Sequence, residues 1–355
     1  KGPIMNATTV YGVDIAKNVF QIRWIDVTTG EIGRKKLSRA KFSEFFAQRQ
    51  PARVALEACG SAHHWARTLS GLGHQVELLP AHQVRAFVVG NKDDAADARG
   101  IWLAAQQGDI RRVAVKSVEQ QAVLSLHRMR AHWINVRTAT INAMRGLLYE
   151  FGVVLPQGKQ VGLKALREQR AKIDEQLPAL MQRLVDDQLK SLADIEAHVL
   201  TMDQEINAVQ KSNPAARRLR QAPGIGVLGA TALAALLGDG TGWRNGREFA
   251  GCLGLSPSHT GTGGKVRMGG ISKRGDPYVR TLLVNGARAV VTRDHPAAWI
   301  VAMLARRPFN VVVVAVAHKL ARQAWALVAH GREYDAGWQS SPPALTAACA
   351  QAQTA

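Results

Sequence analysis

Residues 10–26 read VYGVDIAKNVFQIRWID, and this stretch sets the architecture of the first hundred residues. Residues 10–15 and 19–26 are rich in β-branched and aromatic side chains, with a short polar turn between them, so a β-hairpin is expected. A third strand near 31–37 follows, and then a helix at 40–49, a strand at 54–57, a helix at 62–72 and a strand at 75–79. Helical segments are expected at 82–87 and 94–106. This order predicts a mixed sheet with flanking helices.

Four carboxylates lie at the ends of these elements. Asp14 is on the first strand, Glu57 ends a later strand, and Asp94 and Asp97 are three residues apart at a helix start. Residues at i and i+3 share one helical face, so all four can converge. An acidic residue on the first strand also fits a ribonuclease-H-like plan. The alternative is that Asp94 and Asp97 only favour a helix N-terminus, while the other two are solvated at strand ends.

Such a carboxylate cluster repels itself unless it holds a cation. Hard oxygen ligands favour Mg²⁺ or Mn²⁺. Two such ions would clamp the attacking and leaving oxygens of a phosphodiester. The sequence therefore predicts a metal site made by Asp14, Glu57, Asp94 and Asp97.

The charge is strongly basic and unevenly distributed. The net charge is +19, with an isoelectric point near 10.5, which implies a polyanionic partner such as nucleic acid. Residues 207–322 carry 17 Lys and Arg against 4 Asp and Glu, whereas residues 113–206 carry 12 against 11. Residues 207–322 therefore carry most of the net positive charge.

The remaining composition bears on location. Three widely spaced cysteines give neither a disulfide framework nor a zinc site, which fits a reducing cytoplasm. No signal peptide is recognised, and the plainly apolar run at 311–317 is too short to span a bilayer. We therefore expect a cytoplasmic protein with no membrane partner. Residues 1–4 precede Met5 and are interpreted as an expression scar.

Three parts follow from these patterns: an α/β domain at residues 5–112, a helical linker at 113–213 and a basic, mainly helical domain at 214–335, with a tail at 336–355. In the linker, apolar residues step by three and four along two long helices, which is typical of a coiled coil. On the first helix they are Leu126, Met129, Trp133, Val136, Thr140, Met144 and Leu147. On the second they are Leu192, Ile195, Val199, Met202, Ile206 and Val209. Residues 156–162 contain a proline and two glycines, and we expect them to separate the two helices of a helical hairpin.

The basic domain opens with a helix-hairpin-helix signature. APGIG at 222–226 precedes an apolar helix at 227–237, and Gly224 and Gly226 allow a tight turn. Backbone N–H groups at a helix N-terminus bind phosphate without reading sequence. Arg217, Arg218 and Arg220 flank the turn and favour a nucleic-acid backbone as its ligand. The alternative is a simple turn between two helices.

A segment with little apolar content occupies residues 256–275, between helices, and is expected to be a loop. Its glycines allow a phosphate to approach closely, and Lys265, Arg267, Lys273 and Arg274 can stabilise the phosphate charge. A hydroxyl in this loop could act as a nucleophile. The alternative is a phosphate-binding loop with no covalent role. Helices are expected at 279–291, 297–304 and 311–328.

The ordered motifs resemble those of the DEDD transposases of the IS110 insertion-sequence family, particularly its IS1111 branch, which are related to the pilin-gene inverting recombinase. The matching stretches are GVDIAKNVF (12–20), ALEACGSAHHWA (55–66), NKDDAADAR (91–99), APGIG (222–226) and GLSPSHTGTGGKVRMGGISKRGD (254–276). The resemblance implies a RuvC-like, ribonuclease-H-like domain, a coiled-coil linker and a C-terminal transposase domain. It also implies site-specific recombination guided by a structured non-coding RNA (bridge RNA or seekRNA) that pairs with donor and target DNA.

The resemblance further implies roles for individual residues. Asp14, Glu57, Asp94 and Asp97 match the acidic tetrad that binds Mg²⁺. A serine in the C-terminal loop is the family's nucleophile, and the aligned position here is Thr262. Three explanations remain open: a natural threonine nucleophile, an inactivating substitution, or use of Thr260 or Ser258. A composite site between subunits implies a dimer or tetramer.

Three functions are weighed on these grounds. The first is an RNA-guided DNA recombinase that uses a covalent hydroxyl-phosphoester. The second is a junction-resolving nuclease of the ribonuclease-H-like class, which cuts with metal-activated water. The third is a non-catalytic nucleic-acid-binding protein, for which only salt-sensitive binding is expected. A protein–DNA adduct that survives denaturant separates the first from the second.

Overall fold

The computed structural model describes residues 9–26, 29–88, 94–262 and 265–337. The chain divides into two compact units, one made of residues 1–206 and 235–244 and the other of residues 207–234 and 245–355. The expected scar at 1–4 and most of the expected tail lie outside the described residues. The division into three sequence domains stays a prediction.

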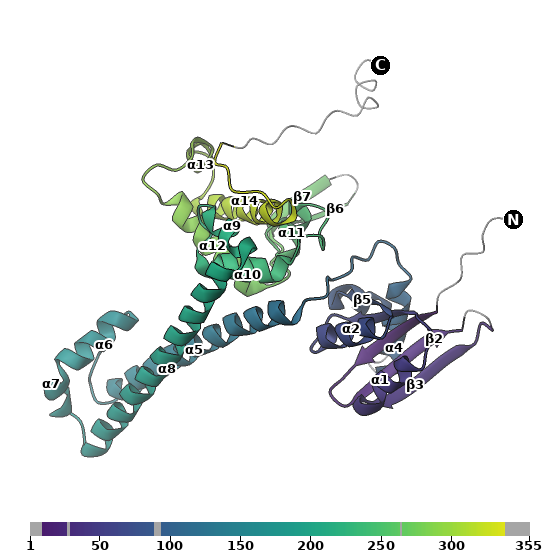
Figure 1. Ribbon diagram of the computed structural model, residues 1–355. Coiled ribbons are helices and arrows are strands. Elements are labelled where there is room, and N and C mark those ends of the chain that lie inside the picture. The colour runs from purple at the N-terminus through teal and green to yellow at the C-terminus, as the bar shows by residue number, and fades with distance from the viewer. Residues whose placement is uncertain (1–8, 27–28, 89–93, 263–264, 338–355) are drawn as a thin grey trace, which may run out of the picture. The chain divides into compact units, whose positions relative to one another are not determined.

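A five-stranded mixed sheet forms the start of the first unit, in the order β3-β2-β1-β4-β5 (Figure 1). The strands are β1 (Val10–Ile15), β2 (Val19–Ile25), β3 (Ile32–Ser38), β4 (Arg53–Glu57) and β5 (Gln75–Leu79). β1, β2 and β3 pair antiparallel, whereas β4 pairs parallel with both β1 and β5. The predicted mixed sheet is confirmed, and it is the sheet of a ribonuclease-H-like domain.

Helices cover both faces of this sheet, because successive strand residues point to opposite sides. Val54 and Leu56 of β4 join one apolar core with Phe42 of α1 (Arg39–Ala47) and Trp65 of α2 (Ala62–Gly71). Ala55, the residue between them, joins a second core with Ile101 of α4 (Asp94–Ala105). Two short helical turns, α3 (Ala81–Val84) and η1 (Arg85–Phe87), lead from β5 toward α4.

Two long helices form the arm that follows. They are α5 (Val118–Tyr149) and α8 (Ala179–Ser212), and α5 begins at a capping box made by Ser117 and Gln120. The pairing is antiparallel, since Trp133 stacks on His198 with ring centroids 4.4 Å apart and Arg130 pairs with Asp203 at 2.5 Å. The predicted helical hairpin is confirmed in this respect.

Two details of the arm differ from the prediction. Met129 and Leu147 are 46% and 43% exposed, whereas the unpredicted Ile141 and Leu148 are buried, so the stripe proposed for the first helix is partly wrong. The break between the arms is also larger than predicted, because α6 (Lys159–Glu168) and α7 (Arg170–Asp174) fold there. Their apolar residues Leu163, Leu166 and Ile173 complete a core with α5 and α8, which a bare hairpin end would leave open. Figure 1 shows both short helices at the end of the arm.

The second unit is mainly helical. Its helices are α9 (Pro214–Gln221), α10 (Val227–Leu237), α11 (Gly246–Cys252), α12 (Pro277–Val291), α13 (Ala298–Leu304) and α14 (Phe309–Ala329). Residues 235–244, which include the last residues of α10 and most of the linker to α11, belong to the first unit. There Arg111 lies over the Trp243 ring and donates a hydrogen bond to the Gly242 carbonyl. The helices predicted at 227–237, 279–291, 297–304 and 311–328 are confirmed, with every end within two residues.

Among the described residues, α14 alone has the length and apolar composition to cross a membrane, and half of its most apolar window is buried within the protein. It packs against α11 and α12, and buried side chains such as Val313, Val316 and Leu320 run along it, which is typical of a core helix. The expectation of no membrane partner stays a prediction.

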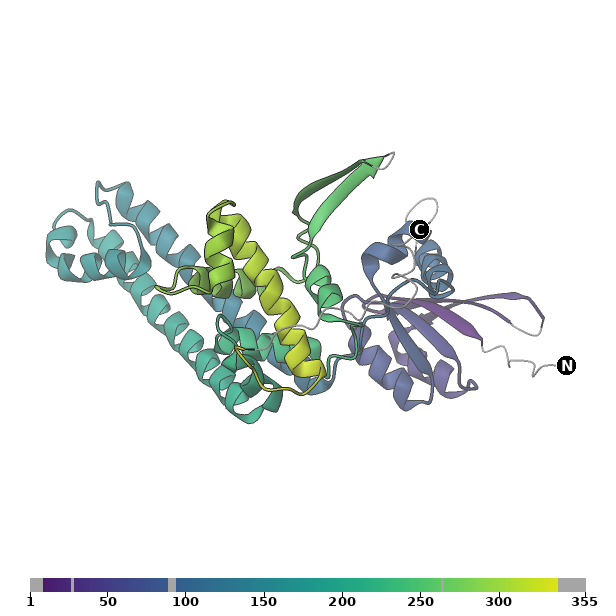
Figure 2. The ribbon, with the colours of Figure 1, turned by 90° about the horizontal axis from the view of Figure 1, so that it is seen from above.

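The loop predicted at 256–275 is wrong in its central part, because residues there form a β-hairpin. Its strands are β6 (Pro257–Thr262) and β7 (Lys265–Ile271), which pair antiparallel. Figure 2 shows this two-stranded ribbon extending from the helices of its unit. Every described residue of β6 is exposed, so cross-strand pairing and not core burial defines the strands.

Candidate active site

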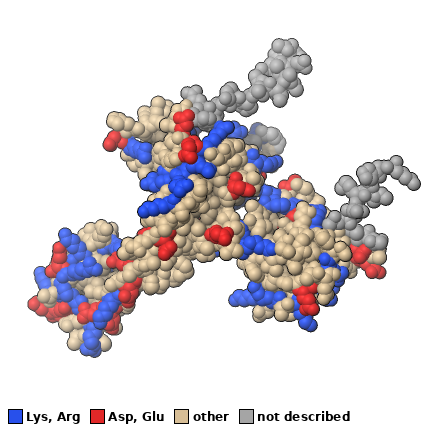
Figure 3. Space-filling model, viewed as in Figure 1, with Lys and Arg blue, Asp and Glu red and all other residues tan. Residues whose placement is uncertain are grey.

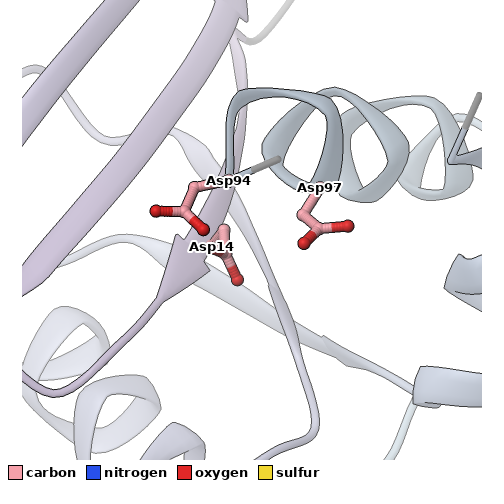
Figure 4. A group of neighbouring side chains, drawn as sticks. All are labelled: Asp14, Asp94 and Asp97. Atoms are coloured by element: carbon pink, nitrogen blue, oxygen red, sulfur yellow. The ribbon is translucent and has the colours of Figure 1, made fainter. Parts of the chain in front are cut away.

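Three acidic side chains meet at one edge of the sheet. Asp14 lies near the end of β1, and Asp94 and Asp97 occupy the first turn of α4. One carboxylate oxygen from each lies within 4.8 Å of the others. Figure 4 shows the three carboxylates facing a common space between strand and helix. The predicted convergence of a strand acid with an i, i+3 helix pair is therefore observed.

Glu57, the fourth predicted ligand, lies on the neighbouring strand. β1 and β4 are parallel with Val13 opposite Leu56, so Glu57 ends β4 beside Asp14. Glu57 is not one of the three clustered carboxylates, but its charge contributes to raising the pKa of Asp14. The structure thus brings three of the four acids together and places the fourth at the adjacent strand end.

The electrostatics of the cluster favour a bound cation. Burial, followed by the charges of Asp97, Asp94 and Glu57, raises the pKa of Asp14 to about 6, against a small lowering by the Ile15 backbone N–H. Carboxylates held this close repel one another, and a divalent cation removes that repulsion. An all-oxygen donor set suits a hard ion such as Mg²⁺ or Mn²⁺, so the residues present fit the metal.

Gly12 allows the helix that carries two of the acids to approach the sheet. A Cβ atom at Gly12 would lie 2.5 Å from the Trp102 backbone nitrogen and 2.7 Å from the Ala98 carbonyl oxygen. The Trp102 indole N–H also donates to the Val10 carbonyl at 3.1 Å, which ties α4 to β1. Sequence reasoning missed this residue. Its only signal was a glycine inside an otherwise β-rich run, which suggests close approach of another backbone.

The β6–β7 hairpin aligns hydroxyls with cations. Thr262 is directly opposite Lys265, and Thr260 is directly opposite Arg267. Directly opposite residues project to the same face of a hairpin, and residues two apart share that face, so both pairs lie on one side. Ser258 differs, because its hydroxyl donates to the Gly270 carbonyl at 3.0 Å. Thr262 and Thr260 are therefore better placed than Ser258 to act on a ligand.

The other predicted nucleic-acid contacts lie mostly on the surface of the second unit. Exposed side chains are Arg217, Arg220, Lys265, Arg267, Lys273 and Arg274. Arg218 is half-buried, 3.8 Å from Glu333. Figure 3 shows Lys and Arg gathering over this unit.

The two glycines of the helix-hairpin-helix turn have different surroundings. Gly226 is exposed just before α10, with open space where a Cβ would be, as a phosphate-binding turn requires. Gly224 has a φ of +91°, and a Cβ there would lie 2.8 Å from Val290 and 3.0 Å from the Gly286 carbonyl oxygen. Gly224 therefore serves packing between the turn and α12.

Comparisons with known proteins match both parts of the chain. A family model for DEDD transposases of IS110 matches residues 11–152, and one described as "Transposase IS116/IS110/IS902 family" matches residues 216–299. A Pseudomonas aeruginosa protein named as a family 20 transposase is 43% identical over 339 residues, which cover 94% of this chain and 100% of the relative.

Two further relatives are similar over nearly their whole length. The transposase for insertion sequence element IS1328 of Yersinia enterocolitica is 36% identical over 332 residues, covering 92% of this chain and 98% of the relative. The transposase for insertion sequence element IS1111A of Coxiella burnetii is 35% identical over 338 residues, covering 94% and 93%. The N-terminal match includes all four acidic positions, and the C-terminal match includes the hairpin.

Proposed function

The chain belongs to the IS110 family of DEDD transposases. We propose that it is an RNA-guided recombinase that cuts and rejoins DNA through a covalent hydroxyl-phosphoester. The observation that carries the proposal is the meeting of Asp14, Asp94 and Asp97 at the edge of a ribonuclease-H-like sheet. A DEDD nuclease domain implies a divalent metal, and these are its candidate ligands. The guide RNA is inferred from the motif resemblance.

We assign the metal site to Asp14, Asp94 and Asp97, with Glu57 completing the set, and the ion to Mg²⁺, with Mn²⁺ as a substitute. When bound, such an ion supplies electrostatic stabilisation to the oxygens of the reacting phosphodiester. The protein's own contribution is positional: Asp14 is fixed in the register of β1, and α4 holds the other two acids against it through the contact at Gly12. The site is therefore built on regular elements.

Thr262 is the proposed nucleophile. Its oxygen forms a bond to phosphorus while the bond from phosphorus to one sugar oxygen breaks, and the hydroxyl proton leaves as the sugar oxygen gains one. The ester conserves the energy of the broken phosphodiester, so strands can be rejoined without ATP. Lys265, opposite Thr262 on the hairpin, and Arg267 supply positive charge for the phosphate. The threonine methyl stiffens χ1 and crowds the approach, so Thr260 is kept as the second candidate.

Several finer features of the proposal come from the resemblance. The acidic site and the hairpin would meet in a composite site between subunits of a dimer or tetramer. The likeness to the IS1111A transposase supports placement in the IS1111 branch. The basic C-terminal surface would contact the guide RNA and the donor and target DNA, in the cytoplasm of a bacterial cell at its nucleoid.

The alternatives are weakened but have distinct outcomes. Membership in a transposase family argues against a non-catalytic binding protein. A junction-resolving nuclease would use the same acids with water as nucleophile, and would leave free DNA ends with no protein attached.

The proposal is tested by measuring excision and insertion in vitro. The reaction contains purified full-length protein, the RNA that co-purifies with it and DNA carrying the element ends. Asp97→Asn is expected to abolish strand exchange while RNA binding is retained. Asp109→Asn, an exposed carboxylate of the same domain outside the cluster, is the matched control and should act as wild type. Full recombination by Asp97→Asn would overturn the proposal.

A further inference from the structure

A cavity of about 180 Å³ lies between the second half of α5 and the start of α6. It is lined by Arg137, Thr138, Ile141, Asn142, Arg145 and Lys159, which we call the arm pocket. Three of the six lining residues are cations, and two more carry neutral hydrogen-bonding side chains. None of them belongs to the acidic site or to the predicted nucleic-acid contacts.

The two arginines of the arm pocket lie on one stripe of α5. Arg137 and Arg145 are eight residues apart, with the buried Ile141 midway, so they share a helical face. Arg145 is held in place, because its Nη2 donates to the Pro156 carbonyl at 2.6 Å and to the Gly158 carbonyl at 2.9 Å. In both arginines the Nε atom is buried with no hydrogen-bond partner among the described residues. Buried donors without acceptors are rare, so both guanidinium groups retain hydrogen-bonding capacity that the described residues do not use.

The N-terminus of α6 adds further positive potential. Its N-cap is Gly158, which offers no side chain to accept from the first-turn N–H groups of this ten-residue helix. Lys159, its first residue, pairs with Glu196 at 2.5 Å. With that pair neutral, the two arginines still leave the lining with a net charge of about +2. A Cβ at Gly162 would lie 2.4 Å from Arg145 Nη2, so this glycine is what admits the guanidinium beside α6.

The arm pocket stands out from its surroundings. Residues 113–206 as a whole are almost neutral, with 12 basic and 11 acidic side chains, and Figure 3 shows the two signs interspersed on the arm. The arm therefore does not attract a polyanion along its length. Within this near-neutral arm, the pocket brings two guanidinium groups, a hydroxyl and an amide into one lining.

We propose that the arm pocket binds one backbone phosphate of a nucleic acid, which fixes the strand on the end of the helical arm. The proposal rests on the proposed function, since it requires a nucleic-acid partner. Guanidinium and hydroxyl donors match the oxygens of a phosphodiester, and contacts of this kind position a strand without reading its sequence. The lining has no exposed aromatic side chain on which a base could stack.

Binding of full-length protein to two probes tests the proposal: the RNA that co-purifies with it, and a 40-base-pair duplex DNA of arbitrary sequence. Arg137→Gln removes one charge and keeps most of the aliphatic stem. At about 150 mM salt it is expected to weaken binding of one probe roughly 3- to 10-fold. The slope of log Kobs against log salt should fall by about 0.7 for RNA or about 0.9 for duplex DNA. The probe that responds identifies the source of the phosphate.

Lys164→Gln is the matched control. Lys164 lies on α6 of the same arm, and Lys164→Gln removes the same charge. Its side chain is 72% exposed and lies 3.7 Å from Glu168, outside the arm pocket. It should leave affinity and slope unchanged. Asn142→Glu places a negative charge in the pocket at an exposed position where folding is not at risk, and should weaken the same probe, whereas Asn142→Gln should not.

The outcomes are separable. If wild type binds neither probe, the proposed function itself fails. If wild type binds but Arg137→Gln and Asn142→Glu match Lys164→Gln in affinity and slope for both probes, the arm pocket is not a phosphate site, and the proposed function is untouched.

Discussion

Removing the Asp14 carboxylate should stabilise the metal-free protein, although it destroys the site. Burial and the neighbouring acids raise the pKa of Asp14 from 3.8 to about 6. Because the folded-state pKa is the higher one, the ionised group opposes folding, fully at pH values above about 6. At about 1.4 kcal/mol per pKa unit, the ionised carboxylate destabilises the folded protein by at most about 3 kcal/mol. Solvent screening of this half-buried group reduces it to about 1–2 kcal/mol.

Asp14→Asn should therefore raise the local stability of the N-terminal sheet by about that amount at pH 7.5 in EDTA. The gain should shrink as pH falls through 6 and vanish below about 4, where the carboxyl is protonated in both states. Hydrogen exchange of the β1 and β4 peptides, corrected for intrinsic rates, measures this gain in stability. At pH 7.5 exchange should be roughly 5- to 30-fold slower in the variant. Mg²⁺ should slow exchange in wild type and not in the variant.

Asp109→Asn controls for the loss of a surface charge. Exchange at pH 7.5 in EDTA that is unchanged or faster in Asp14→Asn would show that the acids do not repel one another in the folded protein.

Three further outcomes are expected. Gly12→Ala should push α4 away from β1. Mn²⁺ affinity, measured by calorimetry, and strand exchange should both fall by about 10-fold or more. Gly60→Ala should change neither, because a Cβ at Gly60 would have no atom within 4 Å. Equal metal affinity of the two variants would contradict the role of Gly12. Thr262→Ser should keep or raise the yield of covalent adduct on denaturing gels, and Thr262→Val should abolish it; adduct formation by the valine variant would exclude Thr262. Glu77→Gln should lower the free energy of unfolding of the first unit by about 2–3 kcal/mol in urea, because Arg53 and Arg112 both pair with this 12%-exposed side chain. A variant as stable as wild type would show that the two ion pairs contribute no net stability.

Local sequence patterns predicted much of the secondary structure of the α/β domain. The two strands predicted at 10–15 and 75–79 have the observed bounds, because strand propensity depends on residue types within a few positions. The cluster of Asp14, Asp94 and Asp97 followed from the element order and one helical spacing.

What sequence reasoning missed depends on tertiary contact. The role of Gly12 appears only when Trp102, ninety residues later, packs on it. The β6–β7 hairpin has no buried face in β6 and so no apolar alternation to reveal it. On α5 the exposed Met129 fits the three-and-four spacing as well as a buried residue does, and the partner helix alone decides which side is covered.

The most direct measurement is the site of DNA attachment. Full-length protein is incubated with its co-purified RNA, DNA carrying the element ends and Mg²⁺, then denatured, digested and analysed by mass spectrometry. A nucleotide remnant is expected on Thr262, lost in Asp14→Asn and retained in Ser258→Ala. Cleaved DNA with free ends and no modified peptide, or an adduct that forms equally without Asp14, would contradict the account.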